Sequence, residues 1–279
     1  MSILSGLESF GFRNADRKVF EDEADTKETV EEKQEKKENV LREEDVLFPK
    51  TYKCPVCDNS FKSLAVRAGK VHSIGQDDDL RPRYEIVDPI KYDAIVCPHC
   101  GYSAIARYFD YVMPLQGKKL RSEVMSKFKG MELSVDKYSY EEAITHYKMV
   151  LMCDIIGNVT NSRKAYTCLK MAWVIRGWLE AEGETLSSRK QEELKANHKE
   201  CLKNALEGYM KAFSTETFPL SGMDEVTVSY LIAQLAYEVE DYQTSLRMLA
   251  NVLGNKNVSS RIKDKALDLK EKIRAKVKK

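Results

Sequence analysis

The sequence has no long apolar run and no strong excess of charge of either sign. Its longest apolar stretch, residues 149–156, includes Asp154 and is much shorter than the roughly 18 residues needed to cross a bilayer. The start, MSILSGLESFGF, lacks the basic segment of a signal peptide. The formal net charge is only +1, whereas general nucleic-acid binders usually have an obvious basic excess. We therefore expect a cytoplasmic protein with no membrane span.

Recognisable catalytic motifs are missing too. The chain has no G-x-S-x-G, no phosphate-binding glycine loop and no H-E-x-x-H. Three of its four histidines, His72, His146 and His198, have no partner at catalytic spacing. These absences predict a protein that is not an enzyme.

Cysteine is scarce, and more than half of it is concentrated in two motifs. Four of the seven cysteines form two C-x-x-C pairs: Cys54, Cys57, Cys97 and Cys100. An odd total in a chain without an export signal argues against a disulfide framework. The remaining three, Cys153, Cys168 and Cys201, lie in helical sequence, where we expect them to be small buried apolar residues.

Each pair lies in a sequence typical of a metal-binding turn, KCPVCDNSF or VCPHCGYSA. Two cysteines three positions apart can present both sulfurs to one ion, and zinc binds four thiolates in a tetrahedron. The residue after the second cysteine must tolerate the left-handed backbone region, which suits Gly101 best and Asp58 next. His99 lies between two cysteines and is expected to point outward. The two motifs together predict one structural zinc ion, bound by all four cysteines.

The spacing of the motifs leaves alternatives open. The second motif starts 40 residues after Cys57, whereas a compact zinc ribbon separates its pairs by about 15–20 residues. The intervening strands must therefore form an inserted β-sheet that returns the chain to the first motif. Iron in a rubredoxin-like redox site would use the same turn, which CPHCGY resembles. A dithiol redox pair would need one exposed C-x-x-C, and a catalytic zinc would need an open coordination position. Structural zinc is the favoured interpretation.

Composition divides the chain into three parts. Residues 1–47 form an acidic arm, expected to be largely disordered because residues 21–45 have almost no apolar side chains. A short apolar cluster precedes that stretch and would dock on a partner or on the protein's own helices: Ile3, Leu4, Leu7, Phe10 and Phe12. Residues 48–112 contain both cysteine motifs and four strand-like runs, FKSLAV, KVHSI, YEIVD and DAIV. They predict a small zinc-ribbon-like β module.

Residues 113–279 follow the helical period. Four residues are suited to cap helices: Ser139, Ser188, Asp224 and Asp241. Residues 138–151 resemble the second helix of a tetratricopeptide repeat, and residues 228–253 resemble a whole repeat with Ala233 and Ser245 as its small packing residues. The final helix is basic. The predicted fold class is α+β, a β module followed by an all-α tetratricopeptide-like domain of helical pairs; an ordinary helical bundle is the alternative.

The most charged spot of the β module is residues 77–83, which contain five charged side chains: Asp77, Asp78, Asp79, Arg81 and Arg83. Such a cluster could bind a divalent cation, a phosphate or a partner's charged tail. However, adjacent residues on a strand alternate in direction, so three consecutive aspartates cannot all face one ion. A polar turn with internal ion pairs is the favoured interpretation.

Five segments together resemble a known bacterial family. They are CPVCDNSFKSLAVRAGKV, QDDDLRPRY, YDAIVCPHCGYSA, KMAWVIRGW and YLIAQLAYEVEDY. This combination resembles the family catalogued as domain of unknown function 2225, over about residues 48–254. The resemblance implies a bacterial cytoplasmic protein with a cysteine-rich front end and tetratricopeptide-like helices. It implies no reaction.

The leading functional hypothesis is an interaction module that offers the concave face of its helical pairs to a protein or peptide. The alternative is a nucleic-acid- or ribosome-associated zinc-ribbon protein, which would bind in a salt-sensitive manner. Its basic residues would be the lysines after residue 255 together with Lys62, Arg67, Lys70, Arg81 and Arg83.

Overall fold

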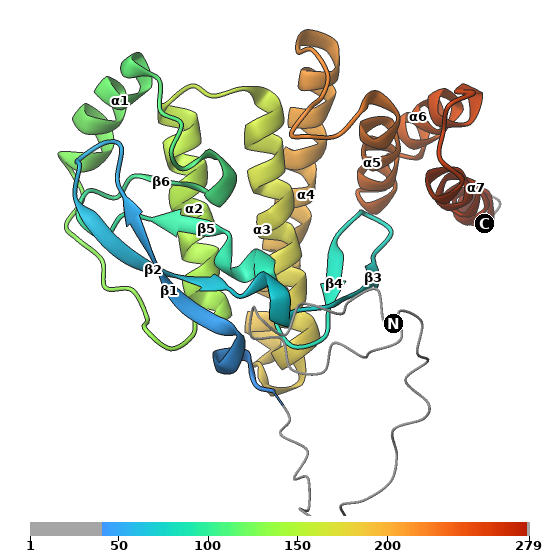
Figure 1. Ribbon diagram of the computed structural model, residues 1–279. Coiled ribbons are helices and arrows are strands. Elements are labelled where there is room, and N and C mark those ends of the chain that lie inside the picture. The colour runs from blue at the N-terminus through green and yellow to red at the C-terminus, as the bar shows by residue number, and fades with distance from the viewer. Residues whose placement is uncertain (1–40, 278–279) are drawn as a thin grey trace, which may run out of the picture. The chain divides into compact units, whose positions relative to one another are not determined.

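A computed structural model describes residues 41–277, with β-hairpins first and helices after them (Figure 1). The predicted apolar cluster and most of the predicted acidic arm lie outside these residues. Within the segment assigned to the arm, the short 3-10 helix η2 (Glu43–Val46) leads into the first strand. None of the described helices is both long enough and apolar enough to cross a membrane.

The β part consists of three separate two-stranded antiparallel sheets. Their strands are β1 (Leu47–Lys53) with β2 (Ser60–Val66), β3 (Ser73–Gln76) with β4 (Pro82–Tyr84), and β5 (Ala94–Val96) with β6 (Ser103–Ile105). The insertion between the cysteine motifs is therefore not one sheet. It contains β2, the β3–β4 hairpin and β5, linked by the 3-10 helices η3 (Ala68–Lys70) and η4 (Pro89–Tyr92).

Two strand predictions were wrong for most of their length. The run KVHSI was expected as a strand, but only Ser73 and Ile74 of it lie in β3. The run YEIVD was expected as a strand, but β4 ends at its first residue, Tyr84. Asp88 instead caps η4, because its side chain accepts a hydrogen bond from the Ile90 N–H at 3.0 Å. Pro89 at the start of this turn has no N–H to give to a neighbouring strand.

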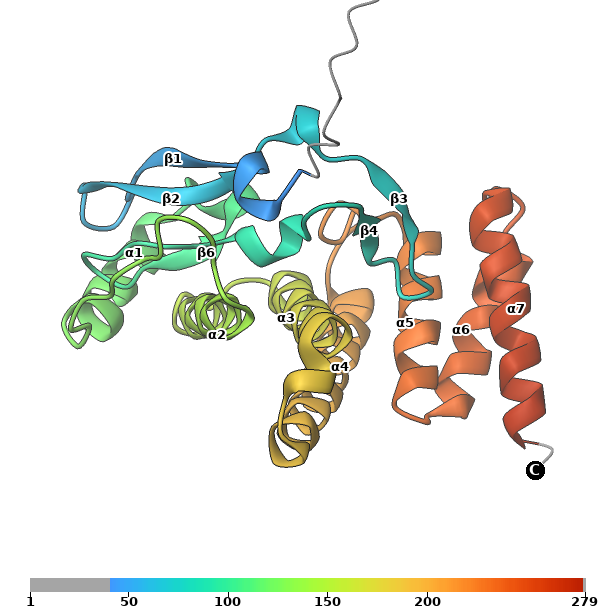
Figure 2. The same ribbon diagram turned by 90° about the horizontal axis from the view of Figure 1, so that it is seen from below.

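The β5–β6 hairpin is buried on both faces. Ile95 and Ala104 belong to a cluster that includes Tyr52 of β1, whereas Ala94 and Ile105 belong to the main core with Tyr147. Figure 2 shows the hairpin between the β1–β2 sheet and α2 (Tyr140–Ile156). This hairpin therefore joins the β part to the helices.

Seven α-helices follow the strands in the described residues. They are α1 (Pro114–Leu120), α2, α3 (Asn161–Glu182), α4 (Ser188–Thr215), α5 (Glu225–Glu238), α6 (Tyr242–Gly254) and α7 (Ser260–Val277). A turn of π-helix, η6 (Arg121–Met125), continues α1, and the short 3-10 helices η5 (Ala106–Tyr108) and η7 (Gly183–Thr185) lie before α1 and after α3. This arrangement confirms the α+β fold class, with a zinc-ribbon-like start and a helical C-terminal part.

The capping predictions were mostly confirmed. Ser139, Asp224 and Asp241 cap their helices by accepting hydrogen bonds from backbone N–H groups. At α4 the prediction was wrong by one position, since Ser187 rather than Ser188 accepts the N–H of Lys190. The two adjacent serines are chemically equivalent, and only the backbone geometry selects between them.

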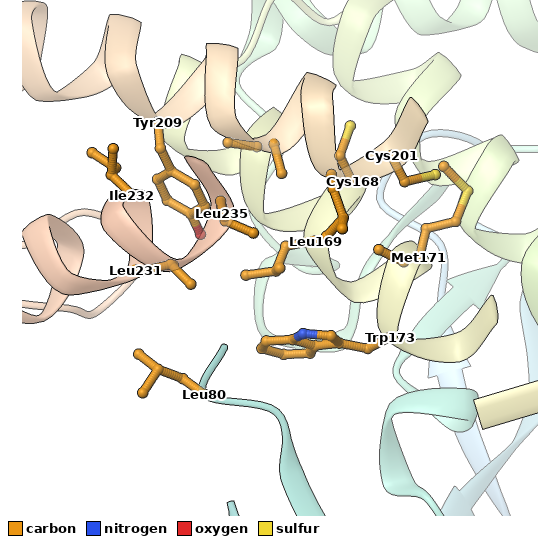
Figure 3. Close-up of a cluster of buried hydrophobic side chains, with 14 of the residues drawn as sticks. Leu80, Cys168, Leu169, Met171, Trp173, Cys201, Tyr209, Leu231, Ile232 and Leu235 are labelled. Atoms are coloured by element: carbon orange, nitrogen blue, oxygen red, sulfur yellow. The ribbon is translucent and has the colours of Figure 1, made fainter. Parts of the chain in front are cut away.

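The core of the helical part lies along α3. Figure 3 shows Leu80, from the turn between β3 and β4, in the same cluster as Trp173 of α3 and Leu231 of α5. At the α5–α6 pair, Ser245 is fully buried and its hydroxyl donates to the Ala233 carbonyl at 2.7 Å. These two small residues allow the close approach of helices that the sequence predicted.

Candidate metal centre

Each C-x-x-C motif forms the turn of a hairpin. The β1–β2 ladder ends at the pair Lys53 and Ser60, one residue before the first motif and three residues after it. The β5–β6 ladder ends in the same way at Val96 and Ser103. The strand pairing that flanks each turn therefore fixes the position of that turn.

The two turns have the same backbone hydrogen bonds. In the first, the Cys54 N–H donates to the Asn59 carbonyl at 2.9 Å, and in the second the Cys97 N–H donates to the Tyr102 carbonyl at 2.8 Å. A second bond in each turn returns to the carbonyl of the first cysteine, from the N–H of Asp58 or Gly101, at 2.9 Å in both cases. The motifs are two copies of one structural unit.

Both residues after the second cysteine have the left-handed backbone that the sequence predicted. The φ angle is 61° at Asp58 and 75° at Gly101. Glycine is required at the second position for another reason. A Cβ atom on Gly101 would lie 2.6 Å from a ring carbon of Phe128, which covers this turn.

The structure brings all four cysteine sulfurs together. Every Sγ atom lies within 4.8 Å of the others, and the Sγ–Sγ distances are 3.6 Å for Cys54 with Cys100 and 3.7 Å for Cys57 with Cys97. A tetrahedron with metal–sulfur bonds of about 2.3 Å has edges of about 3.8 Å. The four cysteines therefore fit a tetrahedral thiolate-bound metal ion.

Hydrogen bonds to the sulfurs support this set of ligands. The Val56 N–H donates to Cys54 Sγ, and the Asn59 side-chain amide donates to Cys57 Sγ, both at 3.4 Å. Such donors stabilise thiolate ligands and orient them. The role of Asn59 was not predicted, although it stands two residues after a candidate ligand.

The thiols also influence one another. Hydrogen bonding with Cys100, and then with Cys54, lowers the pKa of the Cys97 thiol. The hydrogen bond with Cys54 is the largest cause of the raised pKa of the Cys100 thiol. Four thiolates this close repel one another unless a cation lies between them. A bound metal ion would supply that positive charge.

Residues distant in the sequence hold the site in place. The side chains of Leu120 and Val124 pack in one apolar cluster with the cysteines. The Arg121 guanidinium donates to the Val56 carbonyl inside the first turn at 3.0 Å. The thiol of Cys153 on α2 donates to the Gly101 carbonyl at 3.6 Å. None of these roles was predicted, because no local pattern connects these residues with the motifs.

Family comparison covers almost the whole described chain. The model of the family described as "Uncharacterized protein conserved in bacteria (DUF2225)" matches residues 47–273. The chain belongs to this family. No curated protein and no solved structure matches it. The match includes both cysteine motifs and continues into the last helix, beyond the region of resemblance seen in the sequence.

The aspartate run of this DUF2225 chain pairs with residues of α3 and α7. Asp79 is buried and accepts hydrogen bonds from the Trp173 indole N–H at 2.7 Å and from Arg176 at 2.8 Å. Asp78 pairs with Lys272 of α7 at 2.5 Å. Asp77 lies 3.4 Å from Arg176. The interpretation as a polar turn with internal ion pairs is confirmed, and the turn fastens the β3–β4 hairpin to the helices.

Both arginines of the charged run are also engaged. The Arg81 guanidinium pairs with Asp88 at 2.9 Å and with Glu180 at 3.0 Å, and Arg83 pairs with Glu180 at 2.6 Å. Gly177 makes room for this network, since a Cβ there would lie 2.9 Å from Arg81 Nη2. Arg81 and Arg83, which were considered for nucleic-acid binding, therefore form ion pairs within the DUF2225 chain.

The other three cysteines and His99 lie in the environments that the sequence predicted. Cys153, Cys168 and Cys201 are buried, and burial raises the pKa of each thiol. These three cysteines are therefore small core residues, as expected. His99 is exposed, as expected from its place between two ligands.

A groove lies on the helical part of the DUF2225 chain. Its cavity has a volume of about 280 Å³ and is bounded by α2 on one side and α4 on the other, with α3 at its base. The base and lower walls are apolar: Ile144, Leu151, Cys168, Met171, Ile175, Leu194 and Cys201. The rim is polar: Glu141, Thr145, Lys148, Lys190, Glu193, Asn197, Glu200 and Asn204. An apolar base with a polar rim is the usual composition of a binding groove.

Proposed function

We propose that this protein is an interaction module in which one structural zinc ion joins two hairpins and the helical groove receives a protein or peptide. The groove between α2 and α4 is the observation that carries this proposal. The module performs no catalysis of its own. Its two parts have separate tasks, since the metal centre holds the β layer together and the groove binds.

The composition of the metal centre supports a structural role. Four cysteine ligands fill a tetrahedral zinc shell and leave no position for a water molecule or a substrate. Three of the four side chains are buried, and Cys57 is half-buried. Iron would use the same ligands, so metal content per chain, measured on protein purified without added metal, distinguishes the two. We expect one zinc and no iron; stoichiometric iron would point to electron transfer instead.

The groove suits a helical or extended segment of a partner. Its α2 residues recur at helical spacing, from Glu141 through Ile144 and Lys148 to Leu151, so they form one face of that helix. The α4 residues from Lys190 to Asn204 do the same over about 21 Å of helix. Two parallel walls of this kind match the mode in which an amphipathic segment lays its apolar face in a groove.

The test uses a bulky charged substitution at the rim. Thr145→Arg and Asn204→Arg place an arginine in the groove without changing a buried side chain. Asn251→Arg on α6 makes the same chemical change on an exposed residue elsewhere. Proteins that bind the tagged full chain are quantified by mass spectrometry for each variant. We expect at least one ligand to be lost tenfold or more with both groove variants and kept with the control. Equal retention by all variants would contradict the proposal.

A further inference from the structure

Several exposed apolar side chains lie close together in the sequence in residues 111–125, which include α1 and η6. Tyr111, Met113 and Leu115 are 75%, 66% and 68% exposed, and Met125 is 42% exposed. Single exposed apolar residues are ordinary on protein surfaces. Large apolar side chains grouped at nearby positions indicate an interaction site.

The same segment is strongly basic. Residues 111–130 contain five basic residues and one acidic residue, Glu123, in a chain whose net charge is only +1. The basic residues are Lys118, Lys119, Arg121, Lys127 and Lys129. In the described part of the chain, none of the four lysines forms an ion pair. Their charge is therefore available to an anionic partner.

The apolar and basic residues are presented together by α1 and η6. Leu115 and Lys118 are exposed, whereas Gly117, Leu120 and Val124 on the other side are buried. Both views of the molecule show α1 at one edge, at the opposite end of the helical array from α7 (Figures 1 and 2). The element therefore projects its outer face, and the metal centre supports it from within.

We propose that this α1 face, defined by Tyr111, Met113, Leu115, Lys118 and Met125, docks on the surface of an anionic phospholipid bilayer. Protruding apolar side chains of this size enter the boundary between headgroups and acyl chains. Lysines beside them attract anionic headgroups, and each raises binding about fivefold. The few side chains of the α1 face are enough for this kind of contact with a bilayer. This association is separate from the groove and leaves it open.

Two other classes of partner fit the face less well. A specific protein interface usually buries about 800 Å² on each partner, which is more than one seven-residue helix and a single π turn present. Single-stranded nucleic acid would match the lysines, but its bases stack on aromatic rings. Of the apolar residues that define the face, only Tyr111 offers such a ring, whereas Met113, Leu115 and Met125 do not.

The experiment is co-sedimentation of the full metal-loaded chain with vesicles. One set of vesicles contains equal parts phosphatidylglycerol and phosphatidylcholine, and the other contains phosphatidylcholine alone. The face variants are Met113→Ser with Leu115→Ser, and Lys118→Glu with Lys119→Glu. The controls make the same changes elsewhere on exposed residues, Ile74→Ser with Val135→Ser and Lys195→Glu with Lys199→Glu.

We expect the natural chain to sediment with the anionic vesicles only, and less at high salt. Each face variant should bind at least tenfold more weakly, while both controls bind as the natural chain does. Unchanged metal content and thermal unfolding would show that the variants are folded. The proposal is overturned if the natural chain ignores anionic vesicles or if the face variants bind equally well. It is also overturned if the face variants change only self-association or binding to homopolymer RNA.

Discussion

Gly101 combines two requirements in one residue, a left-handed backbone and no side chain. Its φ is 75°, and Phe128 occupies the space where a Cβ would lie. We predict that Gly101→Ala lowers the free energy of unfolding by about 2–4 kcal/mol, through backbone strain and overpacking. The matched control is Gly69→Ala, because a Cβ at Gly69 meets no atom within 4 Å. Denaturant titration of both metal-loaded variants checks the difference, and equal stability would contradict it.

His146 is a buried histidine beneath the β layer. Its side chain lies edge-on to Tyr138 at 4.9 Å, and neither ring nitrogen has a hydrogen-bond partner among the described residues. Burial lowers the pKa of His146 to about 4, against which the nearby Glu142 acts weakly. In the unfolded chain this histidine takes up a proton near pH 6.5, whereas in the folded chain it stays neutral until about pH 4. Stability from this residue is therefore complete above pH 6.5 and is lost as the pH falls.

The expected size of this effect is about 3 kcal/mol between pH 7 and pH 4. We predict that His146→Leu makes the pH dependence of unfolding shallower by about this amount. His198, whose pKa burial also lowers to about 4, remains in the variant and contributes a slope of the same sign. Free energies of unfolding measured across this range for both proteins provide the test. Parallel curves would show that His146 contributes nothing.

At the scale of elements, the β3–β4 hairpin depends on one buried carboxylate. Asp79 is 2% exposed and accepts from both Trp173 and Arg176 of α3. We predict that Asp79→Ala lowers the free energy of unfolding by about 2–4 kcal/mol, because the buried indole N–H loses its partner and Arg176 keeps only the more distant Asp77 and Glu180. Asp77→Ala removes the neighbouring, more exposed carboxylate and should cost less than about 1 kcal/mol. Chemical denaturation compares the two, and similar losses would contradict the assignment.

The elements that the sequence predicted well are those with local causes. The two metal-binding turns, the left-handed residues after them, and the caps Ser139, Asp224 and Asp241 follow from chemistry within a few residues. The failures have distant causes. Nothing near Asp79 identifies Trp173, 94 positions away, as its partner. Composition likewise did not indicate that the insertion would form separate hairpins.

At the scale of the molecule, removal of the metal should affect the two parts differently. The β5–β6 hairpin is held by the site on one side and by α2 on the other. Both tryptophans, Trp173 and Trp178, lie in α3, so tryptophan fluorescence reports on the helical core. Hydrogen-exchange protection of the backbone amides of β1, β2, β5 and β6 reports on the strands next to the cysteines.

We predict that a chelator abolishes most of the exchange protection of these strand amides and leaves helical circular dichroism and tryptophan emission largely intact. Metal binding contributes folding free energy wherever its ligands are not assembled in the unfolded chain. Re-addition of zinc should restore the lost protection. Simultaneous loss of the strand protection and the helical signals would show instead that the two parts fold as one cooperative unit.

The interval between the cysteine motifs has a consequence for biosynthesis. The second pair follows the first by 40 residues, and ribosomes add about 5–20 residues per second. The first pair therefore emerges from the ribosome about 2–8 seconds before the second pair does. Until then it can offer an ion only two sulfurs, and the β1–β2 hairpin must wait with Tyr52 and Phe61 uncovered. A nascent chain halted before residue 97 has half a ligand set, which makes its front end a natural target for chaperones.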